Sequence, residues 1–337
     1  MRPDHTIAVP SPGSSFRAWV RRLGPEHLTA LSIIAAWLVL TVTVTLLDRT
    51  FFSQGVFLAI CFGMATLGIL AVGQSIVIVG GGLFDLSLAV NASASALLVA
   101  FTVSWGWPIV VTIVVALGFG ALFGLINGLV IVWARINPII ATFGTSFVGI
   151  GLLTFVVSRV TPLPTMPVTT ELRRFGISRV LGVPSVMWVM LAFLVLVGAA
   201  ITHTRQGQHL LGVGGNVRAA KARGINVAAM RIAVFTLAGA SSGFAGLMIA
   251  AQFEQAREKV ADGYQFSMIA AAILGGMSLA GGRSSFVGLF AGLMLVATIP
   301  TALAVVDLSS AWSYIIQGVL LLAAISIDAQ RVKRSVE

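Results

Sequence analysis

Charged residues are scarce in this chain of 337 residues. Asp, Glu, Lys and Arg together make up 9% of it, hydrophobic residues make up 58%, and the mean hydropathy is +1.01. Soluble globular domains carry about 25% charged residues, so the composition excludes an ordinary water-soluble protein. Apolar blocks of about 20 residues, the length that a helix needs to cross a bilayer, recur along the sequence. They predict a polytopic membrane protein.

Residues that carry catalysis are also few. The single cysteine, Cys61, lies in an apolar run, which excludes a disulfide framework. Only Lys221, Lys259 and Lys333 are lysines, and none follows a glycine, so no Gly-Lys-Ser/Thr loop cradles a nucleotide phosphate. The four histidines lack metal-ligand spacing, and no buried acid pair indicates proton coupling. We therefore expect no catalytic site, no metal site and no cofactor bound by this chain.

Long apolar windows predict an all-α protein with about ten transmembrane helices. Residues 28–328 would form the transmembrane domain, with polar tails at 1–27 and 329–337. The predicted spans are Leu28–Leu47, Val56–Val79, Leu86–Val103, Pro108–Val132, Ile139–Val157, Val183–Ile201, Ile232–Ala251, Ser267–Leu279, Phe286–Val306 and Trp312–Ile327.

Basic residues predict the orientation of these spans, because Lys and Arg are enriched in cytoplasmic loops. Both ends of the chain are basic, at residues 2–22 and 331–334. An even number of spans then places both termini in the cytoplasm. The external loop 158–184 contains four arginines and runs against this rule, although long loops cross the membrane despite their charge. The placement of basic residues beside apolar spans favours a topological role over nucleic-acid binding.

A division into five and five spans would give the two halves opposite orientations, as in an inverted repeat around a transport pathway. Glycine-interrupted apolar stretches that start at Gly80 and Gly275 lie at loosely matching places in the halves. They are the sequence support for such a repeat.

The segment 203–231, between the sixth and seventh predicted spans, holds the clearest local pattern. Its centre, Gly214 to Asn226, predicts a short surface helix. Asn216 can cap the first turn, two alanines favour helix, and Gly224 can end it in a left-handed conformation. A helix of two turns is unstable alone, so we expect it to dock onto a partner. The alternative is a basic linker held by lipid headgroup phosphates.

The pattern Gly-x-Asn-x-x-Ala-Ala-x-x-x-Gly-Ile, which ends at Ile225, resembles the coupling loop of permease subunits of ATP-binding-cassette (ABC) importers for ribose, xylose, galactose and related solutes. The resemblance extends from about Phe57 to Asp328. Two residues depart from the family pattern: Phe84 stands where Ile is common, and Arg218 where many coupling helices are acidic. Further elements that resemble the family are Gly80–Ser87, Asn127–Gly128, Asn137–Gly144 and Ile269–Gly282.

The resemblance implies a permease subunit, not an enzyme, that forms the pathway for a monosaccharide or sugar-like solute in the bacterial inner membrane. Separate ATPase subunits would bind ATP and Mg²⁺, and a solute-binding protein would bind to loops 158–184 and 252–264. A second permease subunit, either an identical copy or a close homologue, would complete the pathway in the lipid membrane. The residues expected to couple to the ATPase are Gly215, Asn216, Arg218, Ala219, Ala220, Gly224 and Ile225. The alternatives are an ABC permease for branched-chain amino acids or nucleosides, and a self-contained secondary transporter or channel.

Polar residues inside the spans are candidates for the solute pathway. An aspartate at the bilayer centre costs about 2.5 to 3.5 kcal/mol, so Asp85 needs compensation, either from solute hydroxyls or by capping the third helix in water at the cytoplasmic surface. Neutral polar residues in spans also serve as hydrogen-bonding groups between helices, and Asn127 and Ser146 are further examples. The pathway candidates are Asp85, Ser87, Asn91, Thr142 and Thr145.

Overall fold

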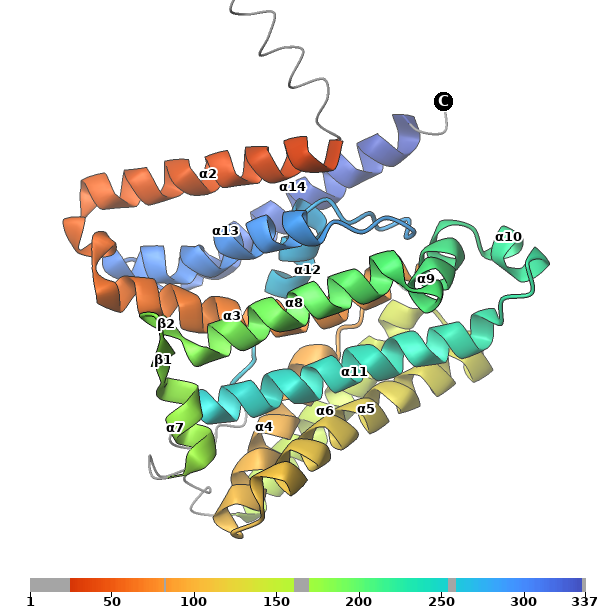
Figure 1. The fold of residues 1–337 in the computed structure, drawn as a ribbon, viewed down its shortest axis with the longest axis horizontal. Helices are drawn as coiled ribbons and strands as arrows, with labels where there is room; N and C mark the ends of the chain where they lie inside the picture. Colours follow the sequence, from red (N-terminus) through yellow and green to blue (C-terminus); the bar gives the residue numbers. More distant parts are fainter. Residues whose placement is uncertain (1–24, 82, 161–169, 254–258, 335–337) are drawn as a thin grey trace, which may run out of the picture.

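A computed structural model describes residues 25–81, 83–160, 170–253 and 259–334, and helices form most of them (Figure 1). Residues 1–24 of the predicted tail 1–27 and residues 335–337 of the predicted tail 329–337 lie outside the described residues. The longer helices are α2 (Pro25–Leu47), α3 (Gln54–Val79), α4 (Leu88–Ser104), α5 (Ile109–Ala134), α6 (Pro138–Arg159), α8 (Ser185–His203), α11 (Val227–Gln252), α12 (Tyr264–Leu274), α13 (Phe286–Val305) and α14 (Ala311–Arg334). Shorter elements are η1 (Arg49–Phe52), α7 (Glu171–Ile177), β1 (Arg179–Val180), β2 (Val183–Pro184), α9 (Arg205–Gly215) and α10 (Val217–Ala222).

Each of the ten predicted windows overlaps one of the longer helices. Among the described residues, eight helices are long and apolar enough to cross a membrane, which makes this a membrane protein. The remaining two, α4 and α12, have 17 and 11 residues. At 1.5 Å per residue, α12 covers roughly 16 Å, about half of the hydrocarbon thickness.

Several boundaries differ from the prediction by a few residues, and two of these differences have clear local reasons. The eighth span was predicted to continue to Leu279, but α12 ends at Leu274 because Gly276 adopts a left-handed conformation with φ of 88°. The stretch from 329 was predicted as a tail, but α14 continues to Arg334. No Gly or Pro interrupts that stretch.

Helices α3 and α11 lie at the centre of the bundle (Figure 1) and pack against other elements more extensively than any other described helix does. Glycines allow α11 to approach α5 closely. A Cβ on Gly124 would collide with the carbonyl oxygen of Phe235, and a Cβ on Gly239 would collide with that of Gly120. Small residues at such crossings are a common feature of helix packing in membranes.

Different elements lie at the two ends of the bundle (Figure 1). The start of α2, the end of α14, and α9 and α10 lie at one end, while α7, β1 and β2 lie at the other. The described ends of the chain are therefore on the same side of the bundle. The segment 203–231 at this end has five Lys and Arg and no Asp or Glu.

One arginine of the loop 158–184, whose basic residues do not fit the expected enrichment of Lys and Arg in cytoplasmic loops, has a structural role. Arg173 on α7 donates hydrogen bonds from Nη1 to the carbonyl oxygens of Gln252 and Ala251 at the end of α11. A cation at a helix C-terminus is favourable because the last carbonyls carry partial negative charge. Gly176 permits the contact, since a Cβ there would collide with the Ala251 carbonyl. The charge of this arginine therefore serves the packing of α7 on α11.

Candidate coupling segment and solute cavity

The predicted surface helix is α10, and its caps are as expected. The side chain of Asn216 accepts a hydrogen bond from the Ala219 N–H at 3.0 Å. At the other end, Gly224 has φ of 80°, and Ile225 N–H donates to the carbonyl of Ala220 at 3.1 Å. With the bond from Gly224 N–H to Lys221 O at 2.9 Å, this is a Schellman ending. The predicted cap, helix and left-handed glycine are thus confirmed.

A second helix that the sequence reasoning missed positions α10. Helix α9 ends at Gly215, and Asn216 serves both as its C-cap and as the N-cap of α10. Ala220 packs with Val213 of α9 and Val227 of α11 in a small apolar cluster, and Ile225 lies against it. Ala220 therefore anchors the helix rather than facing a partner. The exposed residues of the predicted coupling set are Gly215, Asn216, Arg218, Ala219 and Gly224.

The last turn of α9 is held between the two glycine-interrupted stretches. Gly282 N–H donates to Val79 O at 2.9 Å, which joins the stretch from Gly275 to the end of α3. A Cβ on Gly214 would collide with Val79 O and would lie 2.7 Å from Gly282 N. Gly81 and Gly281 complete the contact, and both have positive φ. We call Val79, Gly81, Gly214, Gly281 and Gly282 the glycine junction.

This contact bears on the predicted repeat. Equivalent segments of an inverted repeat lie on opposite sides of the membrane plane, whereas these two stretches touch each other at the α9 end. Their similarity therefore does not support the repeat, which stays a prediction.

Asp85 is fully buried, so the alternative that it caps a helix in water is wrong. It lies in the extended stretch that leads into α4, and its Oδ1 accepts hydrogen bonds from Ser87 N at 2.8 Å and Ser87 Oγ at 2.6 Å. Asn127 Nδ2 donates to Ser87 Oγ at 2.8 Å. Gln74, with its amide turned to satisfy both groups, donates to Asp85 O at 3.0 Å and accepts from Asp85 N at 3.2 Å. Ser87 thus satisfies one carboxylate oxygen of Asp85, while the other, Oδ2, is buried with no hydrogen-bond partner among the described residues.

The other pathway candidates are only partly brought together. Thr142 joins the Asp85 cluster, because its Oγ1 accepts from Leu86 N–H at 3.1 Å. Asn91 instead donates to Gly120 O at 3.2 Å and Gly239 O at 3.4 Å, where it bridges α5 and α11. Thr145 donates to the carbonyl of Thr142 in its own helix. Contact of these residues with a solute stays a prediction, and for the buried ones it requires another conformation.

A polar cavity that the sequence reasoning missed lies between α4, α6 and the start of α12. It has a volume of about 150 Å³. Ser93 helps to shape it by accepting a hydrogen bond from Ala261 N–H at 3.1 Å. In the sequence, Ser93 lies within a predicted span, and nothing there distinguishes it from the other serines in spans. The polar lining residues are Ser93, Ser146, Thr154, Lys259, Asp262 and Gln265.

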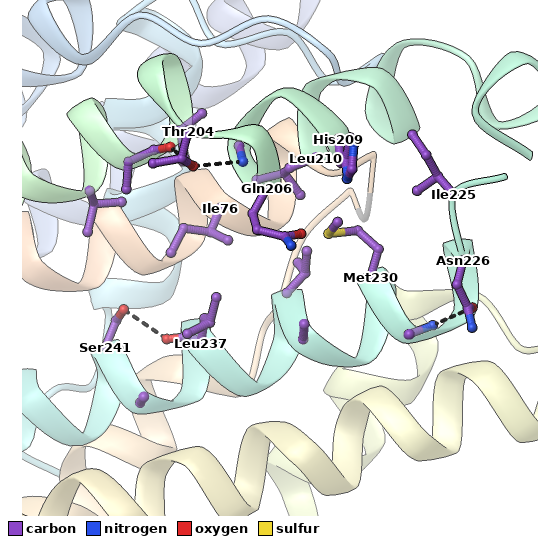
Figure 2. Close-up of a pocket in the computed structure, with 18 of the residues that line it drawn as sticks. Ile76, Thr204, Gln206, His209, Leu210, Ile225, Asn226, Met230, Leu237 and Ser241 are labelled. Atoms are coloured by element: carbon purple, nitrogen blue, oxygen red, sulfur yellow. Dashed lines mark hydrogen bonds between the residues drawn. The ribbon is translucent and has the colours of Figure 1, made fainter. Parts of the chain in front are cut away.

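A larger and mostly apolar groove of about 990 Å³ lies between α8, α9 and α11 (Figure 2). Figure 2 shows Gln206 of α9 and Met230 of α11 pointing toward each other across it. Within the described residues, no group of three or more His, Cys, Asp or Glu side chains lies close enough together to hold a metal ion.

Comparison with known proteins identifies the class. The model of the family described as the permease component of the branched-chain amino acid transport system matches residues 56–325, and the chain belongs to that family. It is therefore a permease component of a transport system, and the ABC importer resemblance predicted from the motifs is confirmed.

The similar curated proteins are import permeases. The chain is 31% identical over 304 residues to the ribose import permease protein RbsC of Escherichia coli (strain K12), which covers 88% of this chain and 93% of that protein. It is 29% identical over 334 residues to the L-arabinose ABC transporter permease protein AraH of Azospirillum brasilense, covering 98% and 96%. It is 32% identical over 228 residues to the galactose/methyl galactoside import permease protein MglC of Haemophilus influenzae, covering 66% and 67%. No solved structure matches.

Proposed function

We propose that this chain forms the transmembrane pathway for a monosaccharide or a closely related solute in a bacterial inner membrane. The observation that carries the proposal is the similarity to ribose and arabinose permeases over most of both chains. The description of the family favours one rival, a branched-chain amino acid permease of the same architecture.

The proposal includes about ten spans, with α9, α10 and both termini in the cytoplasm. The charge of the α10 end supports this orientation, since the segment 203–231 carries five Lys and Arg and no acidic residue. The loops at the opposite end, within 158–184 and 252–264, would then receive the solute-binding protein. Residues 161–169 and 254–258 of these loops lie outside the described part of the chain.

The ATPase subunit would bind the exposed face of α10. Arg218 and Ala219 lie on that face, while Ala220 fixes the helix to the bundle. The ATPase subunits would bind ATP and Mg²⁺, and a second permease subunit would complete the pathway.

The glycine junction offers a route by which α10 could act on the pathway. A shift of α10 moves α9, whose last turn touches the end of α3 and the stretch before α13 with backbone atoms alone. Packed backbones have no flexible side chains to absorb a displacement, so we expect the movement to be transmitted to both stretches. Alternating access would follow from repeated closing and opening of the ATPase dimer.

The polar cavity is the better place for the solute in the described conformation. Sugar hydroxyls need hydrogen-bonding partners once they leave water, and serine, threonine, glutamine and charged side chains line this cavity. The apolar groove would leave those hydroxyls unpaired.

The test is uptake into proteoliposomes that contain this chain with the ATPase and binding protein encoded beside it. Labelled ribose, arabinose, galactose, leucine and a nucleoside would be compared, with and without ATP. Uptake of a sugar that requires ATP and the ATPase is expected. Uptake of leucine or the nucleoside alone would favour the rival permeases, and uptake that needs no ATPase would overturn the importer assignment.

A further inference from the structure

The groove of Figure 2 is a lateral opening in the wall of the bundle. Helices α8 and α11 both pack on α3 but make few contacts with each other. Buried side chains such as Ile76 and Val234 line the groove, and exposed residues such as Ala233 and Leu237 also belong to its lining. Its volume of about 990 Å³ is at the upper end for ligand sites. Its contents are therefore accessible from the surface that the bilayer surrounds.

Most polar residues of the groove lie toward one end, and Ser241, near the other end, donates its hydroxyl to the Leu237 carbonyl of its own helix. Most of its lining, from Phe193 and Phe244 to Leu237, is apolar and contributes no hydrogen-bonding side chain. Gln206, His209 and Arg223, which belong to α9 and the end of α10, lie at the polar end (Figure 2 labels the first two). An occupant that matches these walls has a long apolar part and a polar head.

The end of the groove formed by α9 and the end of α10 is positively charged, and no acidic residue of the segment 203–231 neutralises it. Arg223 is exposed, and among the described residues it forms no ion pair. The surrounding stretch 203–231 contains no Asp or Glu that could neutralise it. A basic residue beside a membrane attracts anionic lipid by about 1 kcal/mol.

We propose that the groove binds one anionic phospholipid, with an acyl chain between α8 and α11 and the headgroup phosphate at Arg223. The bound lipid would connect α8 to the loop Arg223–Asn226, which joins α10 to α11 and also lines the groove. Lipid would thereby hold α10 in place from the side that faces the membrane. This site does not depend on which solute the permease carries.

Native mass spectrometry of the purified full chain tests the proposal. Phosphatidylglycerol would be titrated against phosphatidylcholine with identical acyl chains, and inorganic phosphate would serve as a competitor without an acyl chain. Arg223→Gln removes the phosphate ligand, and Ala233→Trp fills the groove from its exposed rim. The matched controls are Lys221→Gln, which removes a charge from the same helix outside the lining, and Ala228→Trp, an exposed alanine of α11 outside the lining.

We expect retained phosphatidylglycerol with the wild type and both controls, about fivefold weaker binding with Arg223→Gln, and loss of the bound lipid with Ala233→Trp. Equal binding of phosphatidylcholine would overturn the headgroup assignment. Unchanged lipid binding by Ala233→Trp would place lipid elsewhere. Displacement of the lipid by inorganic phosphate alone would indicate an anion site that binds no acyl chain. If the protein instead forms a dimer that is lost in Ala233→Trp, the groove is an interface between two copies of this protein.

Discussion

The apolar groove and the polar cavity are hollows in the same helical bundle, but their walls have opposite chemistry. Six of the eleven residues that line the cavity are polar or charged. The groove is far larger, yet most of its polar side chains lie toward the end formed by α9 and α10, and the hydroxyl of Ser241 is bonded within its own helix. The comparison teaches that volume does not identify the solute site, because a sugar needs hydrogen bonds along its length whereas an acyl chain needs none.

The largest effect is expected beside the groove, at the glycine junction. Gly214→Ala places a methyl group against Val79 O and Gly282 N, where only backbone could move away. We expect destabilisation of about 3 kcal/mol and loss of ATP-driven uptake, measured by thermal unfolding of the purified protein and by proteoliposome transport.

Gly212→Ala is the control for this prediction, because Gly212 lies in the same helix and a Cβ there meets nothing within 4 Å. It should leave the melting temperature unchanged or raise it slightly, since Ala favours helix over Gly. Equal stability of the two variants would show that the close contact at Gly214 is not needed for the fold.

The next largest effect is expected on α10, at the same end of the bundle, where a substitution should reduce transport without reducing stability. Ala219→Trp adds a large side chain to the exposed face of α10 without burying it. We expect ATP-driven uptake to fall at least tenfold and the melting temperature to stay within a degree. Ala134→Trp, at an exposed position on the last turn of α5, is the control. Normal transport by Ala219→Trp would mean that the ATPase binds elsewhere.

An intermediate effect is expected in the polar cavity. Thr154→Val keeps the shape of the side chain but removes a hydroxyl that can bond to solute. One lost hydrogen bond of about 1 kcal/mol corresponds to about fivefold lower uptake at limiting solute concentration. Thr236→Val is the control, because Thr236 bonds to its own helix and lines neither hollow. A fivefold loss of uptake in both variants would mean that the effect of Thr154→Val does not come from its position in the cavity.

The smallest effect lies at the end opposite α10. Arg173→Gln weakens the bonds to the last carbonyls of α11, and we expect a stability loss of about 1.5 kcal/mol with a melting temperature lower by a few degrees. The adjacent and exposed Arg174 supplies the control, Arg174→Gln, which removes the same charge. A similar loss in both would assign the effect to net charge rather than to the helix end.

Features that depend on near neighbours in the chain were predictable. The ten apolar windows each coincide with a helix, and Asn216 and Gly224 bound α10 as their residue types indicate. The sequence also predicted the family, because the pattern up to Ile225 is a local arrangement of a few residues. Caps and helices are set by hydrogen bonds between residues at most five apart, which the sequence displays directly.

Features that join distant residues were not predictable in this way. The sequence could not show that Gln74 bonds to the main chain of Asp85, that Asn127 bonds to Ser87 beside it, or that Arg173 reaches the end of α11.

By itself, the sequence determined that this chain is a helical membrane permease, which ten apolar segments form its longer helices, and how α10 is capped. Only the tertiary structure decided that two glycine stretches meet at Gly214, that serines of different helices line one cavity, and that α8 and α11 leave a groove between them. The reason is physical: membrane partition and capping act along the chain, whereas cavities and close crossings depend on which side chains of separate helices face each other.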